Sequence, residues 1–170
     1  CRVCAILAAA IVSLAFGAAS AQTATSAYNC STVTDIPQAE CEALVALYWA
    51  TDGPNWWCNT DDNPTNDWLV SGNPDHWEGV TVADGHVRVL ELPGQNLAGP
   101  LPPEIGNLVH VEHLFLGFNQ LTGSIPEEIG NLSSARMLWL AYNQLDGPIP
   151  NTLGTLDSLI ELYLDNNRLS

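Results

Sequence analysis

The stretch LFLGFNQLTGSIPEEIGNL, residues 114–132, is followed by a second copy of its own pattern over residues 138–156. Nine positions recur 24 residues later: Leu114, Leu116, Asn119, Leu121, Gly123, Ile125, Pro126, Gly130 and Leu132 return as Leu138, Leu140, Asn143, Leu145, Gly147, Ile149, Pro150, Gly154 and Leu156. So many identities at one fixed lag indicate a repeated structural unit. Four units open at Val87, Val111, Ala135 and Leu159. Because the fourth stops at Ser170 and the sequence lacks an initiating Met, we interpret the chain as a fragment of a longer protein.

The repeated unit, LxxLxLxxNxLxGxIPxxLGxL, resembles leucine-rich repeats, in particular the plant-type 24-residue class of exported bacterial proteins and plant receptor ectodomains. The resemblance implies an α/β solenoid, a right-handed coil with parallel strands on its concave face and an N-terminal cap helix. It covers residues 87–170 as repeats, three complete and the fourth truncated, and residues 35–86 as the cap. Plant caps commonly carry cysteines where this chain has Asp75 and Val82, which favours the bacterial variant.

In such a solenoid the recurring residues all have structural roles. The LxL leucines of each short strand face inward, and the next coil lies about 4.8 Å away. An asparagine after each strand satisfies backbone groups that the bend buries. The glycines permit unusual backbone angles, and the prolines fix an extended or turn segment on the far side. These residues are Asn119, Asn143 and Asn167; Gly99, Gly123 and Gly147; and Pro102, Pro126 and Pro150.

The N-terminal part divides into three segments. Residues 1–21, with Arg2, an apolar run and a small-residue end, predict a secretory signal peptide cleaved before Gln22. A membrane anchor is the alternative, but the run is shorter than the roughly 20 apolar residues that span a bilayer. Residues 22–34 are a polar linker. In the cap, apolar residues at helical spacing predict a helix that ends at Asp52-Gly53-Pro54, and strand-like runs flank Asp84-Gly85.

Three cysteines remain after removal of the signal peptide: Cys30, Cys41 and Cys58. In an oxidising compartment an odd number implies one pair and one further thiol. We expect Cys30 to pair with Cys41, since this bridge would tie the N-terminal strip to the cap helix. Pairing of Cys58 with either of them is the alternative. These three cysteines form no CxxC or Cys/His spacing that would favour a metal site.

The chain is strongly acidic, with 19 Asp and Glu, 4 Lys and Arg, and a net charge of −15. Nucleic acid and anionic membrane surfaces are therefore poor partners, because both require clustered basic residues. The acidic residues are scattered along the chain, which indicates solubility rather than an acidic recognition surface. We expect no membrane insertion by the mature chain.

Function must then lie in the variable outward positions of the strands. The residue between the two leucines of each strand is Glu91, Phe115, Trp139 and Tyr163 in turn. The second position after the strand adds Phe118 and Tyr142, and the position before the middle residue adds His113. Together these positions predict a contiguous candidate binding patch of Phe115, Phe118, Trp139, Tyr142 and Tyr163, with His113 beside it. Exposed aromatic side chains are typical contact anchors. The alternative is that the rings only stack across the strands and set their register.

Catalytic and metal motifs are absent from the sequence. It contains no GxSxG, HExxH or P-loop. The acidic residues Asp61, Asp62 and Asp67 do not have the spacing of a calcium loop. His110 and His113 are three residues apart, but one precedes the strand and the other lies on it, so a shared metal is not expected. We predict no catalytic residues, no metal and no cofactor.

These observations predict a secreted or cell-surface module, not an enzyme, that recognises a protein or glycan through its concave face. Three alternatives remain open. The chain could belong to the ectodomain of a receptor, for instance a receptor-like kinase. It could be the targeting module of a larger secreted enzyme, or a purely structural surface element.

Overall fold

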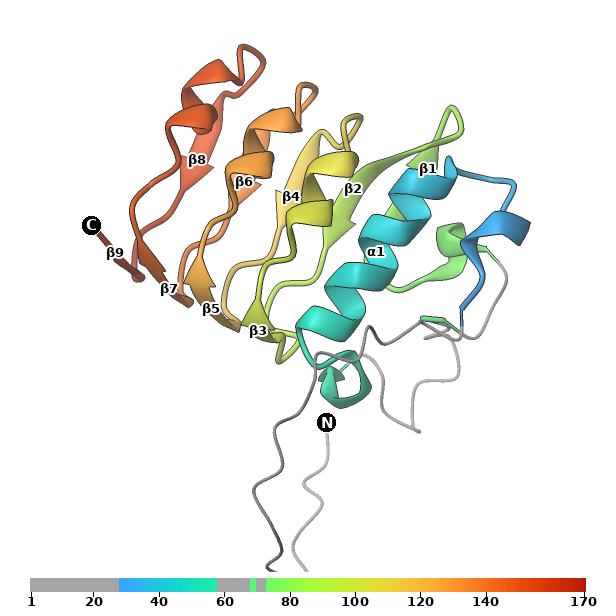
Figure 1. Cartoon of the computed structure of the whole chain (residues 1–170), viewed down its shortest axis with the longest axis horizontal. Helices are drawn as coiled ribbons and strands as arrows, with labels where there is room; N and C mark the ends of the chain where they lie inside the picture. The colour runs from blue at the N-terminus through green and yellow to red at the C-terminus, as the bar shows by residue number, and fades with distance from the viewer. Residues whose placement is uncertain (1–27, 58–67, 70–72) are drawn as a thin grey trace, which may run out of the picture.

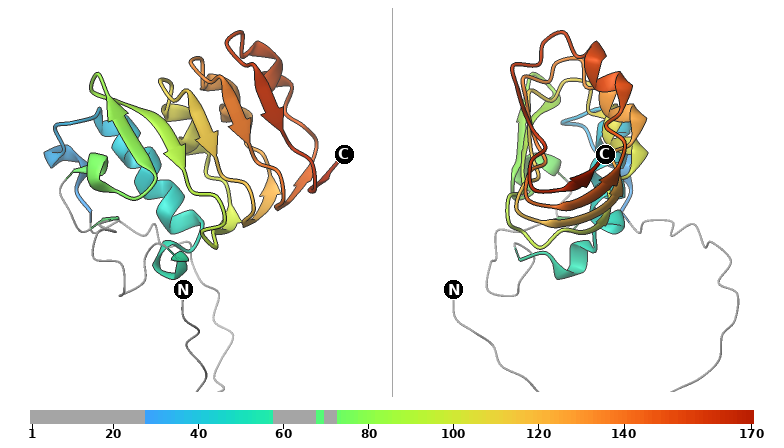
Figure 2. Two further views of the ribbon diagram at one scale, coloured as in Figure 1. Left: turned by 180° about the vertical axis from the view of Figure 1, so that it is seen from behind. Right: turned by 90° about the vertical axis from the view of Figure 1, so that its left-hand side faces the viewer.

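The computed structural model describes residues 28–57, 68–69 and 73–170, which form a row of stacked coils with helix α1 (Gln38–Ala50) at the N-terminal end (Figure 1). Seen end-on, each complete coil has three sides: a strand of one sheet, a strand of a second sheet and a 3-10 helix (Figure 2). This is the α/β solenoid with an N-terminal cap helix that the sequence predicts. The predicted signal peptide and Cys58 lie outside the described residues. No helix within them has the length and apolar character required to cross a bilayer.

One side of the solenoid is a five-stranded sheet in the order β1-β2-β4-β6-β8. Its strands are β1 (Val80–Ala83), β2 (His86–Glu91), β4 (His113–Phe115), β6 (Met137–Trp139) and β8 (Glu161–Tyr163). The first pair is antiparallel, as the Asp84-Gly85 turn predicts, and the others are parallel. Since residues 24 apart are paired, Leu90, Leu114, Leu138 and Leu162 are aligned across the sheet.

A second side is a four-stranded parallel sheet that the sequence analysis does not foresee. It contains β3 (Ala98–Pro100), β5 (Gln120–Ser124), β7 (Gln144–Gly147) and β9 (Arg168–Leu169). These strands are two to five residues long and include glycines with positive φ. A segment this short and rich in glycine gives no alternating apolar pattern from which a strand can be predicted.

The third side consists of short 3-10 helices, η5 (Pro103–Asn107), η6 (Glu127–Asn131) and η7 (Asn151–Thr155). Each begins directly after Pro102, Pro126 or Pro150. A proline there fixes an extended φ before the first turn and removes an N–H that the helix would leave without a partner. The core between the three sides consists of the repeated leucines, and Leu114, Leu116, Leu138 and Leu145 are completely buried.

The asparagine side chains bond each coil to the one before it. Asn119 donates from Nδ2 to the carbonyl oxygen of Leu92, 2.8 Å away in the preceding coil, and to Leu116 O at 3.0 Å. Its Oδ1 accepts hydrogen bonds from Gln95 N and Leu97 N at 2.9 and 3.1 Å. Asn143 and Asn167 make the corresponding bonds. Each buried amide thereby satisfies backbone groups that the bend removes from water.

The cap has an aromatic core of its own. Trp56, Trp68 and Trp77 are each 1% exposed, and their rings are in contact, with centroids 5.0 Å apart for Trp56 and Trp68 and 4.8 Å for Trp68 and Trp77. The short helices η1 (Cys30–Thr32), η2 (Gly53–Asn55) and η4 (Pro74–His76) surround this core. A disulfide joins Cys30 to Cys41 on α1, as expected.

The cap meets the repeats through close backbone contact. Ala98 N donates to Thr51 O, 3.0 Å away at the end of α1. Gly99 has a φ of 126°, and a Cβ atom there would collide with the carbonyl oxygen of Ala50. Only glycine fits this position, because both its backbone angle and its lack of a side chain are required.

Candidate functional site

The outward positions of the five-stranded sheet carry the aromatic residues that the sequence places there. Phe115, Trp139 and Tyr163 lie opposite one another on β4, β6 and β8. Phe115 and Trp139 are half-buried, and Tyr163 is 39% exposed. Phe118 and Tyr142 follow the strands and are about half exposed. We call this surface, formed by Phe115, Phe118, Trp139, Tyr142 and Tyr163, the aromatic face.

The rings of the aromatic face form one continuous set of contacts. Phe115 and Trp139 meet edge to face with centroids 6.1 Å apart, and Trp139 and Tyr163 are 5.2 Å apart. Phe118 and Tyr142 stack almost parallel, at 4.5 Å and 9°. Phe118 also contacts Trp139 at 6.1 Å. The rings therefore support one another across the coils, yet a substantial part of their surface remains open to solvent.

Phe118 and Tyr142 have a backbone conformation that aromatic residues rarely adopt. Their φ angles are 59° and 58°, in the left-handed region. The same position is Gly94 in the preceding coil and Asn166 in the following one, residue types that tolerate this conformation. The turn itself is required, because its N–H donates to the next coil, for example Phe118 N to Ala141 O at 3.0 Å. Folding therefore favours glycine or asparagine here, and the two rings have a conformational cost of roughly 1–2 kcal/mol each.

A shallow cavity of about 230 Å³ opens between the first coils of the aromatic face. It is lined by Glu91, Pro93, Phe115, Gly117, Phe118 and Trp139. The Trp139 indole packs directly against the backbone of Gly117. A Cβ atom on residue 117 would lie only 2.8 Å from indole Cδ1 and Nε1. The absence of a side chain at Gly117 therefore lets the indole lie across the neighbouring coil.

Two polar ring atoms on this surface have unused hydrogen-bonding capacity. Within the part of the chain that the structure describes, Trp139 Nε1 and His113 Nδ1 are both buried and have no hydrogen-bond partner. His113 lies on β4 with its ring 5.7 Å from that of Phe115. A buried polar atom without a partner costs free energy, so both atoms reduce the stability of this part of the fold.

The aromatic face has acidic side chains around it. Glu91 is exposed and lines the cavity, and Glu161 lies beside Tyr163. The Tyr163 hydroxyl donates to Glu161 Oε2 at 2.7 Å. This hydrogen bond raises the pKa of Tyr163, with smaller contributions from the negative charge of Glu161 and from desolvation. The surface therefore combines open aromatic rings with negative charge.

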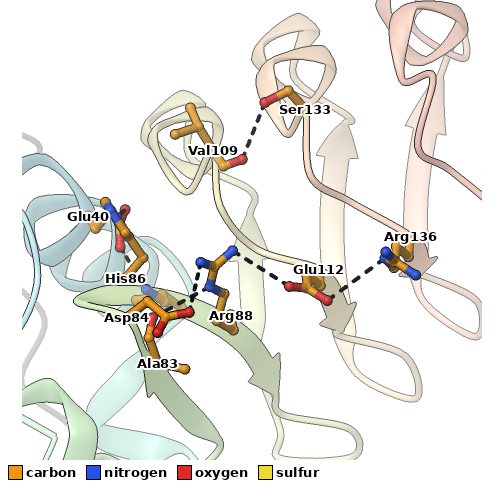
Figure 3. A network of polar contacts seen from close by, with 10 residues as sticks. Glu40, Ala83, Asp84, His86, Arg88, Val109, Glu112, Ser133 and Arg136 are labelled. Atoms are coloured by element: carbon orange, nitrogen blue, oxygen red, sulfur yellow. Dashed lines mark hydrogen bonds and ion pairs between the residues drawn. The ribbon is translucent and has the colours of Figure 1, made fainter.

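A row of ion pairs joins successive coils near the starts of the strands (Figure 3). Glu112 lies between Arg88 and Arg136, at 3.6 Å and 3.8 Å, and Arg88 also contacts Asp84 at 3.4 Å. Arg88, Glu112 and Arg136 are spaced by the repeat length, so the coil itself brings them together. Exposed pairs of this kind each contribute at most about 1 kcal/mol to stability.

The structure brings five of the six predicted binding residues into one ring network and places His113 against it. Sequence reasoning missed Glu91, Pro93 and Gly117 as residues that line the cavity, although Glu91 occupies the same outward position of the repeat as Phe115. It also treated His110 only as a neighbour of His113. In the structure His110 instead packs against His86 of the cap hairpin, with ring centroids 3.8 Å apart.

The fold and the repeat pattern are those of leucine-rich repeat proteins. The family model described as "Leucine Rich Repeat" matches residues 110–132 and 134–156. The chain is 42% identical over 64 residues to Protein MALE DISCOVERER 2 of Arabidopsis thaliana, which covers 36% of this chain and 9% of that protein.

Two solved structures are similar over a larger part of the chain. The PEPR1-AtPEP1 crystal structure has 31% identity and a TM-score of 0.66, covering 78% of this chain and 18% of that one. The plant peptide hormone receptor RGFR1 in complex with RGF2 has 34% identity and a TM-score of 0.51, covering 55% of this chain and 18% of that one. The chain thus spans less than a fifth of each of these three proteins.

Proposed function

We propose that this protein is a non-catalytic extracellular recognition module that binds a polypeptide segment on its aromatic face. The observation that carries the proposal is the pair of aromatic residues in left-handed backbone conformation, Phe118 and Tyr142. Folding does not require rings there, since Gly94 and Asn166 occupy the same position in adjacent coils. Costly conformations that persist without a folding reason are typical of binding sites.

The chemistry of the face favours a particular kind of ligand. Flat, exposed rings bind apolar side chains and cations, and Glu91 and Glu161 add negative charge beside them. A peptide segment with Lys or Arg next to an apolar side chain matches both the rings and the negative charge. A glycan can use the rings, because sugar C–H groups stack on them, but it lacks the positive charge.

The resemblance to a peptide hormone receptor supports a polypeptide ligand, since RGFR1 is described in complex with RGF2. It also supports a second candidate, in which the chain is part of a receptor ectodomain. The full-length reading frame tests this candidate, because a receptor requires a membrane-spanning segment after the repeats.

The experiment begins with an array of peptides and glycans probed with the purified protein. The tightest ligand from the array is then titrated by calorimetry against the wild type and three variants. Trp139→Ala should weaken binding by about 2 kcal/mol, roughly 30-fold, as expected for a central aromatic anchor. Trp49→Ala is the matched control, since Trp49 is 46% exposed but lies near the C-terminal end of α1 and does not line the cavity of the aromatic face.

Tyr142→Asn separates binding from folding. Asparagine suits the left-handed turn, so the gain in backbone energy offsets the lost stacking, and the free energy of unfolding should stay within about 1 kcal/mol of wild type. Binding should fall at least tenfold. If Trp139→Ala and Tyr142→Asn both keep the wild-type affinity, the aromatic face is not the binding site and the rings serve only the fold.

A further inference from the structure

Three potential metal ligands from separate elements converge where the cap meets the first repeat. They are Glu40 on α1, His86 at the start of β2, and His110 between η5 and β4. One ligand atom from each residue lies within 4.8 Å of the other two. His86 Nδ1 is 2.7 Å from Glu40 Oε1 (Figure 3), and the His86 and His110 rings are in contact.

The carboxylate of this cluster is held in place by the fold. Glu40 is only 2% exposed, and its Oε2 accepts a hydrogen bond from Val87 N at 2.7 Å. Its other oxygen faces His86, so both oxygens have fixed positions. Both histidines are half-buried and reach solvent. Among the described residues, neither Nε2 of His86 nor the ring nitrogens of His110 form a hydrogen bond. The cluster therefore combines a fixed anion with available imidazole nitrogens.

We propose that Glu40, His86 and His110 bind a divalent transition-metal ion, with Zn²⁺ as the ion that suits them best. Two imidazoles and one carboxylate are a zinc ligand set, and a water molecule completes four-coordination. Zinc–ligand bonds of about 2.0–2.2 Å place neighbouring ligand atoms roughly 3.3 Å apart. The contact between Glu40 and His86 then opens by about half an ångström. His86 gives up its Nδ1 proton to solvent and carries a proton on Nε2 instead, so that a neutral imidazole presents Nδ1 to the ion. Calcium does not suit the site, because it prefers oxygen ligands alone.

The ion would join the cap to the repeats. Glu40 and His86 are 46 residues apart in sequence, and His110 follows His86 by one repeat length. Folding alone brings them together, so the ion binds the native state more tightly than the unfolded chain and stabilises the native state. The site lies in a different part of the molecule from the aromatic face, and the proposal does not depend on the proposed function.

The test measures zinc binding and thermal unfolding of the purified, untagged protein. All samples carry Cys58→Ser, because a free thiolate would bind zinc by itself. His110→Ala removes one ligand at a half-buried position and leaves the bond between Glu40 and His86 intact. The matched control is His76→Ala, since His76 also lies near a carboxylate, 3.8 Å from Asp75, but belongs to no three-ligand cluster among the residues that the structure describes.

We expect the protein to bind one Zn²⁺ per chain in calorimetry, with at least tenfold weaker binding in His110→Ala and unchanged binding in His76→Ala. Excess Zn²⁺ should raise the melting temperature of the protein by about 3 °C or more, and Ca²⁺ should not. Without metal, the circular dichroism spectra of the three proteins should agree. Absence of zinc binding overturns the proposal, and so does equal affinity in His110→Ala or loss of binding in His76→Ala.

Discussion

Replacing Asn119 with alanine should destabilise the fold far more than loss of one exposed amide would. Three backbone groups lose their partner: Leu92 O, Leu97 N and Gln95 N, which Asn119 holds at 2.8, 3.1 and 2.9 Å. The bonds to Leu92 O and Leu97 N are buried. Each buried group left without a partner costs about 1–3 kcal/mol, so two of them cost roughly 2–6 kcal/mol.

Asn167→Ala is the matched control, because Asn167 has the same role in the last coil, where its bonds are only partly buried. Water can replace the lost partners there, so we expect a loss of about 1 kcal/mol or less. Urea unfolding followed by circular dichroism gives both free energies by linear extrapolation. If Asn119→Ala costs less than about 1 kcal/mol, or no more than Asn167→Ala, the buried amides do not stabilise the coils as argued here.

Three further predictions concern the core, the cysteines and the edge of the aromatic face. Leu140→Ala should destabilise the fold by about 2–5 kcal/mol because Leu140 is 1% exposed, whereas Leu162→Ala, at a site 41% exposed, should cost clearly less in the same urea titration. Thiol labelling with peptide mapping of the oxidised protein should modify Cys58 alone, and a label on either disulfide cysteine would contradict the pairing. In an absorbance titration, Glu161→Gln should move the pKa of Tyr163 down toward its ordinary value, because the hydrogen bond to the Glu161 carboxylate and, to a smaller extent, its negative charge hold the pKa above that value; an unchanged titration would show that the hydrogen bond is absent in solution.

The repeat pattern was sufficient to predict most of the solenoid. Inward leucines such as Leu114 and Leu138 could be identified because every coil places them at the same position, and the pairing of the strands follows from the repeat length. The role of Asn119 was predictable for the same reason. The second sheet was not predictable, since β9 has two residues and β3 includes Gly99 and Pro100. Strands of this kind depend on the neighbouring coil, not on a local sequence pattern.

The candidate sites were likewise predictable only where their residues recur with the repeat. The aromatic face was predictable because Phe115, Trp139 and Tyr163 recur at one position of the unit. The strain at Phe118 and Tyr142 was not, because it depends on a backbone angle. The cluster of Glu40, His86 and His110 could not be predicted either, since the cap helix and hairpin have no repeat to indicate which residues meet.

The asparagine bonds give the solenoid a direction. Asn143 Oδ1 accepts from Leu121 N, 3.0 Å away in the preceding coil, whereas the equivalent amide of its own coil, Leu145 N, bonds to Asn167. A defect at one asparagine therefore affects the coil nearer the N-terminus. In Asn143→Ala, hydrogen exchange should accelerate at the amide of Leu121 and stay nearly unchanged at that of Leu145. Each coil thus needs the asparagine of the following coil to satisfy its backbone amide, and the loss of one asparagine destabilises the coil on its N-terminal side.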